Sequence, residues 1–363
     1  MTKKKILIAT GGTGGHVFPA YSLASYLIKN NYNVQISTDT RGYIFLKKYK
    51  NLKIINLPLS PLKKGIFNFL FSIAKIFYSI ITSFIFLLFN RPSVIFGMGG
   101  YSSFPICVAA SILRIKFVIY ESNLIIGKAN KYLIPFTKKI FVSYNELEGI
   151  SKKYKDKIFK IGNIIREEMI EFKINDHQLD QSSSMKILVL GGSQAAKIFA
   201  EALPEVFEKL KNFKFPIKIF QQCLKSQNNQ LSQFYTINKI DHEIFNFTDN
   251  IIKYYSKADL VITRSGASVL GELINVKKPF ISIPLPSSAD NHQYKNAQFY
   301  KTKGCGFLLD EKDIKNKLFD LIRYIFNDKL TIKEILSNQR QFSDKNIFRN
   351  LENQLKEILN EKN

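Results

Sequence analysis

The sequence predicts an α/β protein built from two doubly wound parallel-sheet domains of the Rossmann type. Short apolar runs alternate with helix-length segments along most of the 363 residues, a pattern typical of a parallel sheet covered by helices on both faces. The same opening also occurs twice. Residues 5–8 (Lys-Ile-Leu-Ile) and 186–189 (Lys-Ile-Leu-Val) each lead into a glycine pair and a helix-length segment. Because the plan is repeated, and because the chain is too long for one ordinary α/β core, we expect two domains.

The first domain is expected over residues 1–163. It opens with a strand at 5–10, a glycine turn at 11–15 and a helix at 19–29, with Pro19 in the first helical turn, where proline is tolerated. Later strands of this domain are expected at 33–38, 52–57, 93–96, 117–120 and 139–142. Helix-length segments separate them, as the crossovers of a parallel sheet require.

The second domain is expected over residues 185–341, after a polar linker at 164–184. It opens with a strand at 185–190, a glycine turn at 191–193 and a helix at 195–210. Its later strands are expected at 217–220, 260–263 and 279–283. Apolar and charged residues alternate at helical spacing over about 310–363. We expect the last helix, about 342–363, to pack back on the first domain.

The chain carries a strong excess of positive charge. Lys and Arg total 53 against 29 Asp and Glu, which gives a formal net charge of +24. Dense positive charge attracts polyanions such as nucleic acid or an anionic membrane. The chain is also rich in Asn, Ile and Phe and has no Trp, which indicates a general compositional bias as the alternative explanation. Of the two polyanions, we expect an anionic membrane surface and no nucleic acid as the partner.

Composition and missing motifs exclude several other classes. With 45% hydrophobic residues the chain can bury a core, so disorder is not expected. Cys107, Cys223 and Cys305 are far apart and odd in number, which argues against a disulfide framework or a zinc site and fits a reducing cytoplasm. The sequence has no DxD pair, HExxH motif or Walker loop, so we expect no metal and no cofactor. The apolar run at 6–9 is too short for a signal peptide.

The segment Gly11-Gly-Thr-Gly-Gly-His16 falls where the first strand meets the first helix. Backbone N–H groups and the helix dipole favour an anion there, and glycine lets a phosphate approach closely. The third glycine of the GxGxxG dinucleotide motif would fall at Val17, so NAD binding is disfavoured. Asp39, after the second strand, either binds a ribose or is a turn residue. His16 either acts as a general base at the ligand edge of the sheet or caps the turn.

A second glycine loop, Gly97-Met-Gly-Gly-Tyr101, follows another predicted strand. It gives the first domain one more phosphate-type loop than a single nucleotide sugar needs. Residues 66–89 form the longest apolar tract. This tract is either a core helix or a partly exposed helix that lies on an anionic bilayer; a transmembrane span there would interrupt the βα pattern. The lysines nearby are Lys47, Lys48, Lys50, Lys63 and Lys64.

Taken in order, the motifs resemble those of the MurG family, glycosyltransferases of peptidoglycan synthesis. The matching blocks are residues 11–19, 97–101, 121–130, 162–166, 191–194, 264–272 and 290–293. The resemblance implies a GT-B fold, in which two Rossmann-like domains face a cleft, with the donor on the C-terminal domain and the acceptor on the N-terminal one. It implies metal-independent, inverting transfer of N-acetylglucosamine from its UDP conjugate to undecaprenyl-diphosphoryl-N-acetylmuramoyl-pentapeptide. It also implies a peripheral protein at the cytoplasmic face of the bacterial inner membrane.

The resemblance also assigns site residues, motif by motif. His16 would be the catalytic base. The donor sugar and diphosphate would contact Thr13, Gly14, Gly15 and Asn123 from the first domain. Arg166 and the backbone around Thr248 would hold the uracil, and Ser193 a phosphate. The diphosphate and ribose would lie against the block that contains Arg264, Ala267, Ser268, Val269 and Glu272. His292 and Gln293 would read ribose and sugar hydroxyls, and Gly99, Gly100 and Tyr101 would cradle the acceptor diphosphate.

Some positions depart from the family pattern. Tyr120 stands where His is frequent, Ala195 and Lys197 replace Gly and Arg, and Val269 lacks the hydroxyl of the usual Thr. Three other functions are weighed against the resemblance: a GT-B transferase with another lipid acceptor, such as a diglyceride glucosyltransferase, an NAD-dependent oxidoreductase, and a non-enzymatic membrane-binding protein. The last two do not account for the glycine blocks.

Overall fold

The computed structural model describes residues 4–12, 14–59, 66–172, 184–343 and 345–361, without the side chains of 66–71 and 192–196. The chain forms two compact units. Unit 1 comprises Met1–Arg166 together with Asn346–Asn363, and unit 2 comprises Glu167–Lys345. The helix at the C-terminal end thus belongs to the first unit, whereas the polar stretch after Arg166 begins the second with the short helix α6 (Glu167–Ile170). Residues 173–183 of the expected linker lie outside the described residues.

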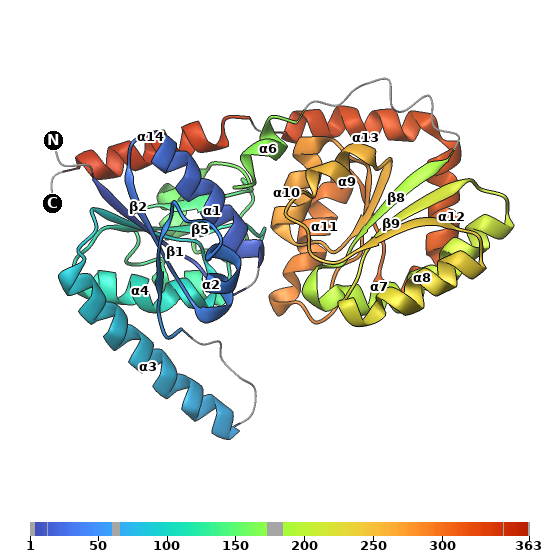
Figure 1. The fold of residues 1–363 in the computed structure, drawn as a ribbon. Helices are drawn as coiled ribbons and strands as arrows, with labels where there is room; N and C mark the ends of the chain where they lie inside the picture. The colour runs from blue at the N-terminus through green and yellow to red at the C-terminus, as the bar shows by residue number, and fades with distance from the viewer. Residues whose placement is uncertain (1–3, 13, 60–65, 173–183, 344, 362–363) are drawn as a thin grey trace. The chain divides into compact units, whose positions relative to one another are not determined.

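Unit 1 contains a seven-stranded sheet in the order β3-β2-β1-β4-β5-β6-β7 (Figure 1). Every neighbouring pair in it is parallel. The strands are β1 (Lys5–Ala9), β2 (Asn33–Thr38), β3 (Lys53–Asn56), β4 (Val94–Gly97), β5 (Phe117–Glu121), β6 (Ile140–Val142) and β7 (Ile158–Lys160). The central strands are apolar on both faces because helices cover both, as a parallel sheet requires.

Helices cover the first sheet on its two faces. The helices are α1 (Gly14–Lys29), α2 (Thr40–Leu46), α3 (Ile66–Phe89), α4 (Gly100–Ile112), α5 (Lys128–Leu133) and α14 (Ile347–Asn360). One core cluster joins β1, β4 and β5 to residues of α3, α4 and α5, including Leu87, Ile106 and Leu133. On the other face α14 packs on α1, where Tyr26 stacks on Phe348 and donates a hydrogen bond to Glu352 (2.9 Å).

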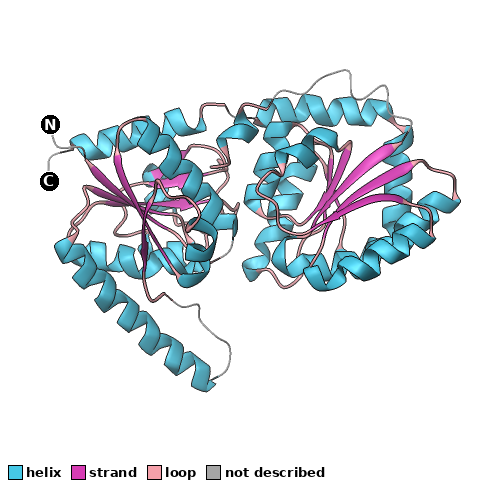
Figure 2. Ribbon diagram, in the orientation of Figure 1, coloured by secondary structure: helices cyan, strands magenta, loops and turns pink. Residues whose placement is uncertain are grey.

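Unit 2 repeats the same strand order in a six-stranded parallel sheet, β10-β9-β8-β11-β12-β13 (Figure 2). Its strands are β8 (Met185–Leu190), β9 (Ile217–Gln222), β10 (Asp241–Phe245), β11 (Leu260–Thr263), β12 (Phe280–Ser282) and β13 (Phe307–Leu308). Its longer helices are α7 (Gly192–Asn212), α8 (Asn228–Ile237), α9 (Ile252–Lys257), α10 (Ala267–Val276), α11 (His292–Thr302), α12 (Ile314–Asn327) and α13 (Lys329–Phe342). A core cluster joins β8 to α7, α8 and α12.

The predicted class, two parallel-sheet α/β domains, is confirmed, and the local differences have physical reasons. Helix α1 begins at Gly14, so that Pro19 lies in its second turn, where it removes a single helical hydrogen bond. Likewise α7 begins at Gly192 and not at 195. The strands β7, β10 and β13 were not predicted. All three are edge strands whose residues are half-exposed or exposed, and β13 has only two residues, so none carries an apolar run long enough to indicate a strand.

Candidate functional site

Each sheet has one point at which the strand order reverses, and the predicted loops lie there. In unit 1, β1 and β4 are neighbours, although the chain leaves β1 for β2 on the other side. The glycine loop after β1 and the glycine loop after β4 therefore meet at the same sheet edge. In unit 2, β8 and β11 are the corresponding pair. Open α/β proteins bind ligands at the carboxyl ends of the strands that flank such a point.

His16 lies in the first turn of α1 and contacts the second glycine loop. Its Nδ1 is 3.1 Å from the carbonyl oxygen of Met98, the residue after β4. A carbonyl oxygen only accepts, so Nδ1 carries the proton of the neutral imidazole and Nε2 carries the basic lone pair. A Cβ placed on Gly100 would lie 3.5 Å from this Nε2. The contact with Met98 thus fixes both the ring and the tautomer, and directs Nε2 to the start of α4.

Gly99 is the residue that lets the second loop come so close. Its backbone has φ 83° and ψ −179°, a region that residues other than glycine essentially do not adopt. A Cβ here would also lie 3.2 Å from the Tyr120 carbonyl oxygen and 3.3 Å from Asn130 Nδ2. Both conformation and space therefore require glycine between β4 and α4.

Asn123 is held by the carboxylate of Glu121, to which the motif match assigned no role. Glu121, at the end of β5, is buried with 4% of its surface exposed. Its Oε1 accepts from the Asn123 backbone N–H (3.1 Å) and from Asn123 Nδ2 (3.0 Å). Its Oε2 accepts from Gly127 N–H (2.8 Å) and Asn130 Nδ2 (3.0 Å). Glu121 thus orients Asn123, and the motif spacing alone, without these contacts, did not indicate its role.

Asp39 is a helix-capping residue, as the turn interpretation predicts. It is the N-cap of α2 and accepts from the backbone N–H of Gly42. Its other hydrogen bonds come from Gly12 N–H and the Tyr101 hydroxyl. Since protein donors engage both carboxylate oxygens, the ribose interpretation of Asp39 gains no support.

Tyr120, one of the departures from the family pattern, organises the segment that leads to Arg166. Its hydroxyl accepts from the Ile164 backbone N–H (2.9 Å) and lies 2.8 Å from the Ser143 hydroxyl. Tyr120 is buried in β5. The segment that contains half-buried Arg166 is therefore attached to the centre of the first sheet through this hydroxyl.

Thr13 and Ser193 are predicted contacts that belong to the glycine loops after β1 and β8. Thr13 lies outside the described residues, as does the side chain of Ser193. The backbone of Gly191 and Ser193 is described: Gly191 is the N-cap of α7, and Ser193 lies in the first turn of this helix. The loop after β8 therefore repeats the strand–glycine–helix junction of the loop after β1, where Gly14 and Gly15 start α1.

Arg264, directly after β11, is buried against the protein. Its Nη1 donates to the carbonyl oxygens of Ile283 (3.2 Å) and Pro284 (3.1 Å), and its Nη2 pairs with Glu311. The guanidinium also lies over the Phe199 ring, 4.9 Å from the ring centroid. These contacts tie β11 to the chain after β12 and to α7. Arg264 therefore supports the loop that carries the next predicted residues.

The start of α10 presents the predicted block 267–272. Gly266 is the N-cap, Ala267 is buried, and Ser268 and Val269 are half-exposed in the first turn. Glu272 is half-buried and accepts a hydrogen bond from the Tyr255 hydroxyl (3.0 Å). The valine supplies no hydroxyl, so a polar contact in this turn comes from Ser268 or from backbone N–H groups.

His292 and Gln293 begin α11. They follow two residues with left-handed backbone, Asp290 (φ 50°) and Asn291 (φ 54°). His292 Nδ1 donates to the Ala289 carbonyl (2.7 Å), and Gln293 Oε1 accepts from the Leu285 N–H (3.0 Å). A left-handed pair of this kind is strained and persists where the surroundings fix it.

Thr248 lies in the loop after β10. Its hydroxyl oxygen accepts from the Asn250 backbone N–H (3.1 Å) and closes a turn. The predicted unit 2 residues thus follow β8, β10, β11 and β12, on the carboxyl ends of a single parallel sheet.

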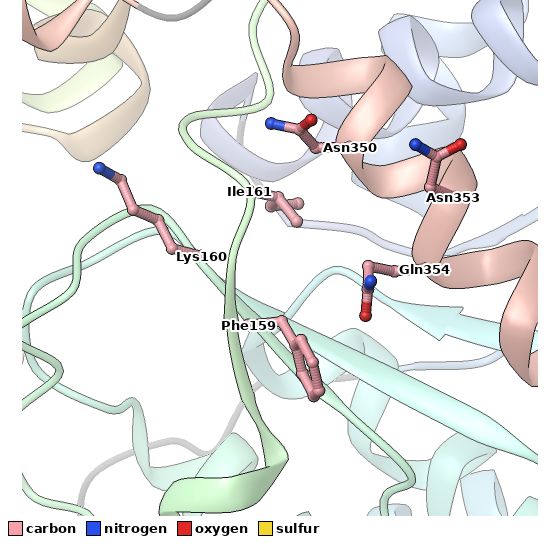
Figure 3. A pocket seen from close by; sticks show the side chains of 6 residues that line it. All are labelled: Phe159, Lys160, Ile161, Asn350, Asn353 and Gln354. Atoms are coloured by element: carbon pink, nitrogen blue, oxygen red, sulfur yellow. The ribbon is translucent and has the colours of Figure 1, made fainter.

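A hollow of about 230 Å³ in unit 1 lies away from all predicted site residues. Figure 3 shows it between β7 and α14, lined by Phe159, Lys160, Ile161, Asn350, Asn353 and Gln354. Within the described residues, no group of three or more His, Cys, Asp or Glu side chains is arranged to hold a metal ion. The candidate site residues therefore lie in the loops at the carboxyl ends of the strands of each unit, and not in the hollow.

Two Rossmann-like units, each with a glycine loop at its strand-order reversal, have the architecture of the GT-B fold of glycosyltransferases. Comparison with known proteins specifies the family. Residues 6–142 match the N-terminal domain of glycosyltransferase family 28, and residues 186–360 match its C-terminal domain. The chain belongs to this family.

Two relatives of the chain carry the same name. The UDP-N-acetylglucosamine–N-acetylmuramyl-(pentapeptide) pyrophosphoryl-undecaprenol N-acetylglucosamine transferase of Pelagibacter ubique is 36% identical, over 99% of both chains. The transferase of the same name from Rickettsia felis is 36% identical over 92% of this chain and 94% of its own. Among solved structures, MurG of Acinetobacter baumannii has a TM-score of 0.79 at 22% identity, covering 98% of this chain and 99% of that one.

Proposed function

We propose that this protein transfers N-acetylglucosamine from UDP-N-acetylglucosamine to the 4-hydroxyl of the muramoyl sugar of undecaprenyl-diphosphoryl-N-acetylmuramoyl-pentapeptide. The observation that carries the proposal is the 36% identity, along 99% of both chains, to a transferase named for this donor and acceptor. The two glycine loops of unit 1 support it, because a diphosphate-linked acceptor needs a phosphate-binding loop in addition to those for the donor. No cofactor enters the reaction.

The chemistry is a single in-line displacement. The acceptor hydroxyl oxygen attacks the anomeric carbon of the donor sugar, the bond from this carbon to the UDP oxygen breaks, and the electron pair leaves with UDP. The hydroxyl proton goes to Nε2 of His16, whose tautomer the Met98 carbonyl fixes. Because the attack comes opposite to the leaving group, an α-linked donor gives a β-1,4-linked product.

The roles of the binding residues follow the motif match. UDP leaves from unit 2. Its diphosphate is stabilised there by backbone N–H groups at the starts of two helices, α7, which contains Ser193, and α10, which contains Ala267 and Ser268. Glu272 accepts the ribose hydroxyls. Unit 1 binds the acceptor diphosphate with Gly99, Gly100 and Tyr101. The remaining donor contacts are those of Thr13, Gly14, Gly15, Asn123, Arg166, Thr248, Val269, His292 and Gln293, while buried Arg264 supports the loop before α10.

The lipid acceptor requires contact with a membrane, and α3 supports this. The segment Ser72–Phe89 is long and apolar enough by length and composition to cross a membrane, with 22% of it buried. Ser79 and Ser83 are buried against the unit together with Leu87, while Phe77, Ile81 and Phe89 are exposed. Ser79 even donates to the Pro58 carbonyl (2.6 Å). An apolar face of this kind, with exposed lysines at 47, 48 and 50, fits peripheral binding to an anionic bilayer.

In a bacterial cell this membrane would be the inner membrane at its cytoplasmic face, because the UDP-linked donor is a cytoplasmic metabolite. The protein would bind there peripherally, since α3 is a single helix between β3 and β4 of a folded unit. A helix in that position reaches the bilayer surface without carrying either neighbouring strand across it.

A donor and acceptor panel tests the proposal. The purified protein is incubated, with a chelator and without added metal, with labelled UDP-N-acetylglucosamine or UDP-glucose, and with either a lipid-linked muramyl pentapeptide or diacylglycerol. We expect transfer only with UDP-N-acetylglucosamine and the muramyl acceptor. Transfer of glucose to diacylglycerol would instead support the other class of lipid glycosyltransferase, and absence of any transfer beside an active control enzyme would refute the proposal.

A further inference from the structure

Three loops of unit 1 meet at the carboxylate of Asp39. Asp39 follows β2 and has 2% of its surface exposed. Its Oδ1 accepts from the backbone N–H of Gly12 (3.0 Å), in the loop after β1, and of Gly42 (2.8 Å), in the first turn of α2. Its Oδ2 accepts from the hydroxyl of Tyr101, in the loop after β4. One side chain therefore connects the carboxyl ends of three neighbouring strands.

These loops are also packed closely. A Cβ on Gly11 would lie 2.5 Å from Ser102 Oγ and 2.8 Å from Asp39 Oδ1. The Tyr101 ring covers the first loop, because a Cβ on Gly12 would lie 3.4 Å from Tyr101 Cε1. A change in the position of one loop must therefore move the others.

The charge of Asp39 is compensated within the same cluster. Arg41 Nε lies 3.7 Å from Asp39 Oδ2, and Arg41 Nη2 donates to the Tyr101 hydroxyl. Burial and the hydrogen bond to Asp39 raise the pKa of Tyr101, so that this hydroxyl stays protonated and donates to the carboxylate. The carboxylate is thus surrounded by three hydrogen-bond donors and the guanidinium of Arg41. Arg41 thus also reduces the repulsion that Asp39 would exert on a nearby anion.

We propose that Asp39 is a positioning residue for the acceptor diphosphate. It acts through Tyr101 and Gly12, holding the two glycine loops in the geometry in which the N–H groups at the starts of α1 and α4 bind the diphosphate. The N–H of Gly12 is itself given to Asp39, so it belongs to the scaffold and makes no phosphate contact. This inference rests on the proposed function, because it takes the acceptor to be a lipid diphosphate.

Asp39→Asn is the variant that tests it. The amide oxygen keeps the acceptor for Gly12 and Gly42, whereas the amide nitrogen replaces the acceptor for Tyr101 with a donor. The probe is farnesyl diphosphate, whose Kd is measured for the wild type and the variant, beside the Kd of UDP and the acceptor KM in the transfer assay. We expect the Kd of the probe and the acceptor KM to rise roughly tenfold, with the Kd of UDP unchanged. A tenfold change corresponds to about 1.4 kcal/mol.

A double-mutant cycle separates positioning from a general loss of structure. If Asp39 acts through Tyr101, Tyr101→Phe weakens binding of the probe, and Asp39→Asn adds little in the Tyr101→Phe background. The control is Asp328→Asn, another aspartate N-cap, which accepts from Leu330 and Thr331 N–H groups (both 3.1 Å) at the start of α13 in unit 2. It should leave binding of the probe unchanged.

Different results would contradict the positioning role of Asp39 and the proposed function. A wild-type Kd for farnesyl diphosphate in Asp39→Asn, or effects of Asp39→Asn and Tyr101→Phe that simply add, would overturn the positioning role. Tight binding of the probe by the wild type that Asp39→Asn weakens, together with no transfer by the wild type, would overturn the proposed function and leave the positioning role supported.

Discussion

At the scale of single residues, the motif glycines and His16 could be predicted from the sequence because their roles depend on neighbours in the chain. A strand, a glycine turn and a helix follow each other within a dozen residues, and this local order fixes the place of His16 and Gly99. The roles of Glu121 and Arg264, and the contacts of Asp39 outside its own turn, could not be predicted. They depend on contacts with loops far away in the sequence, such as Arg264 with Ile283 and Glu311, which spacing does not reveal.

The first prediction concerns His16. His16→Ala should lower kcat roughly 10²- to 10⁴-fold, the usual contribution of a general base, with the Kd of UDP unchanged. The measurement is steady-state kinetics beside UDP titration. His242→Ala is the matched control, because the Nδ1 of His242 also contacts a backbone carbonyl, that of Ile240 (2.9 Å), but on β10. Nearly full turnover in His16→Ala would reduce His16 to a structural cap.

The second prediction concerns Lys278, which is buried before β12 and donates to the Ala258 carbonyl (2.8 Å). Burial lowers its pKa from 10.5 to about 8. Between these two values the unfolded chain binds more protons than the folded one, so the contribution of Lys278 to stability rises with pH. The free energy of unfolding of the wild type should therefore rise by about 3 kcal/mol relative to Lys278→Met between about pH 7 and pH 11.

Chemical denaturation of both proteins across this pH range measures the difference. Groups other than Lys278 titrate in both proteins, so their contributions cancel in the comparison. A difference that stays constant, or that falls as the pH rises, would show that Lys278 is not desolvated in the folded protein.

At the scale of the elements, periodicity predicted the buried strands and the edge strand β3, but it missed the edge strands β7, β10 and β13. The strands β1, β4 and β8 carry nearly continuous apolar runs because helices cover both faces of the sheet. The edge strand β10 has a charged, partly exposed sequence. It forms a strand because its backbone pairs with β9, although its residues show no apolar run. For α3, composition indicated an apolar helix, but the burial of its serines and the exposure of its aromatic residues became visible only with α4 in place.

The third prediction follows from α3. Phe77→Ser combined with Ile81→Ser removes two exposed apolar side chains. It should weaken binding to vesicles that contain about 30% anionic lipid roughly 30-fold, because insertion of each side chain contributes on the order of 1 kcal/mol. Vesicle sedimentation measures this. The matched control is Ile237→Ser with Leu330→Ser, two exposed apolar residues of unit 2. Equal loss in both double variants would contradict a membrane role for α3.

At the scale of the whole molecule, the two units share one strand order, 3-2-1-4-5-6 in each from its own first strand, with a seventh strand in unit 1. The repeated Lys-Ile-Leu opening predicted this duplication, since it marks the central strand of each sheet, β1 and β8. The return of the chain to unit 1 through α14 depends on long-range contacts, such as Lys139 Nζ with Glu357 (2.5 Å). The helical periodicity after 310 indicates helices but not the unit that they join.

The structure of the reaction product directly tests whether this protein transfers N-acetylglucosamine to the 4-hydroxyl of the muramoyl sugar. The wild type is incubated with UDP-N-acetylglucosamine and the lipid-linked muramyl pentapeptide in the presence of a chelator, and the product is analysed by mass spectrometry and by NMR of the new linkage. We expect one added N-acetylhexosamine in a β linkage to the 4-hydroxyl of the muramoyl sugar, and release of UDP. An α linkage, attachment at another hydroxyl, or no product beside an active control enzyme would contradict it.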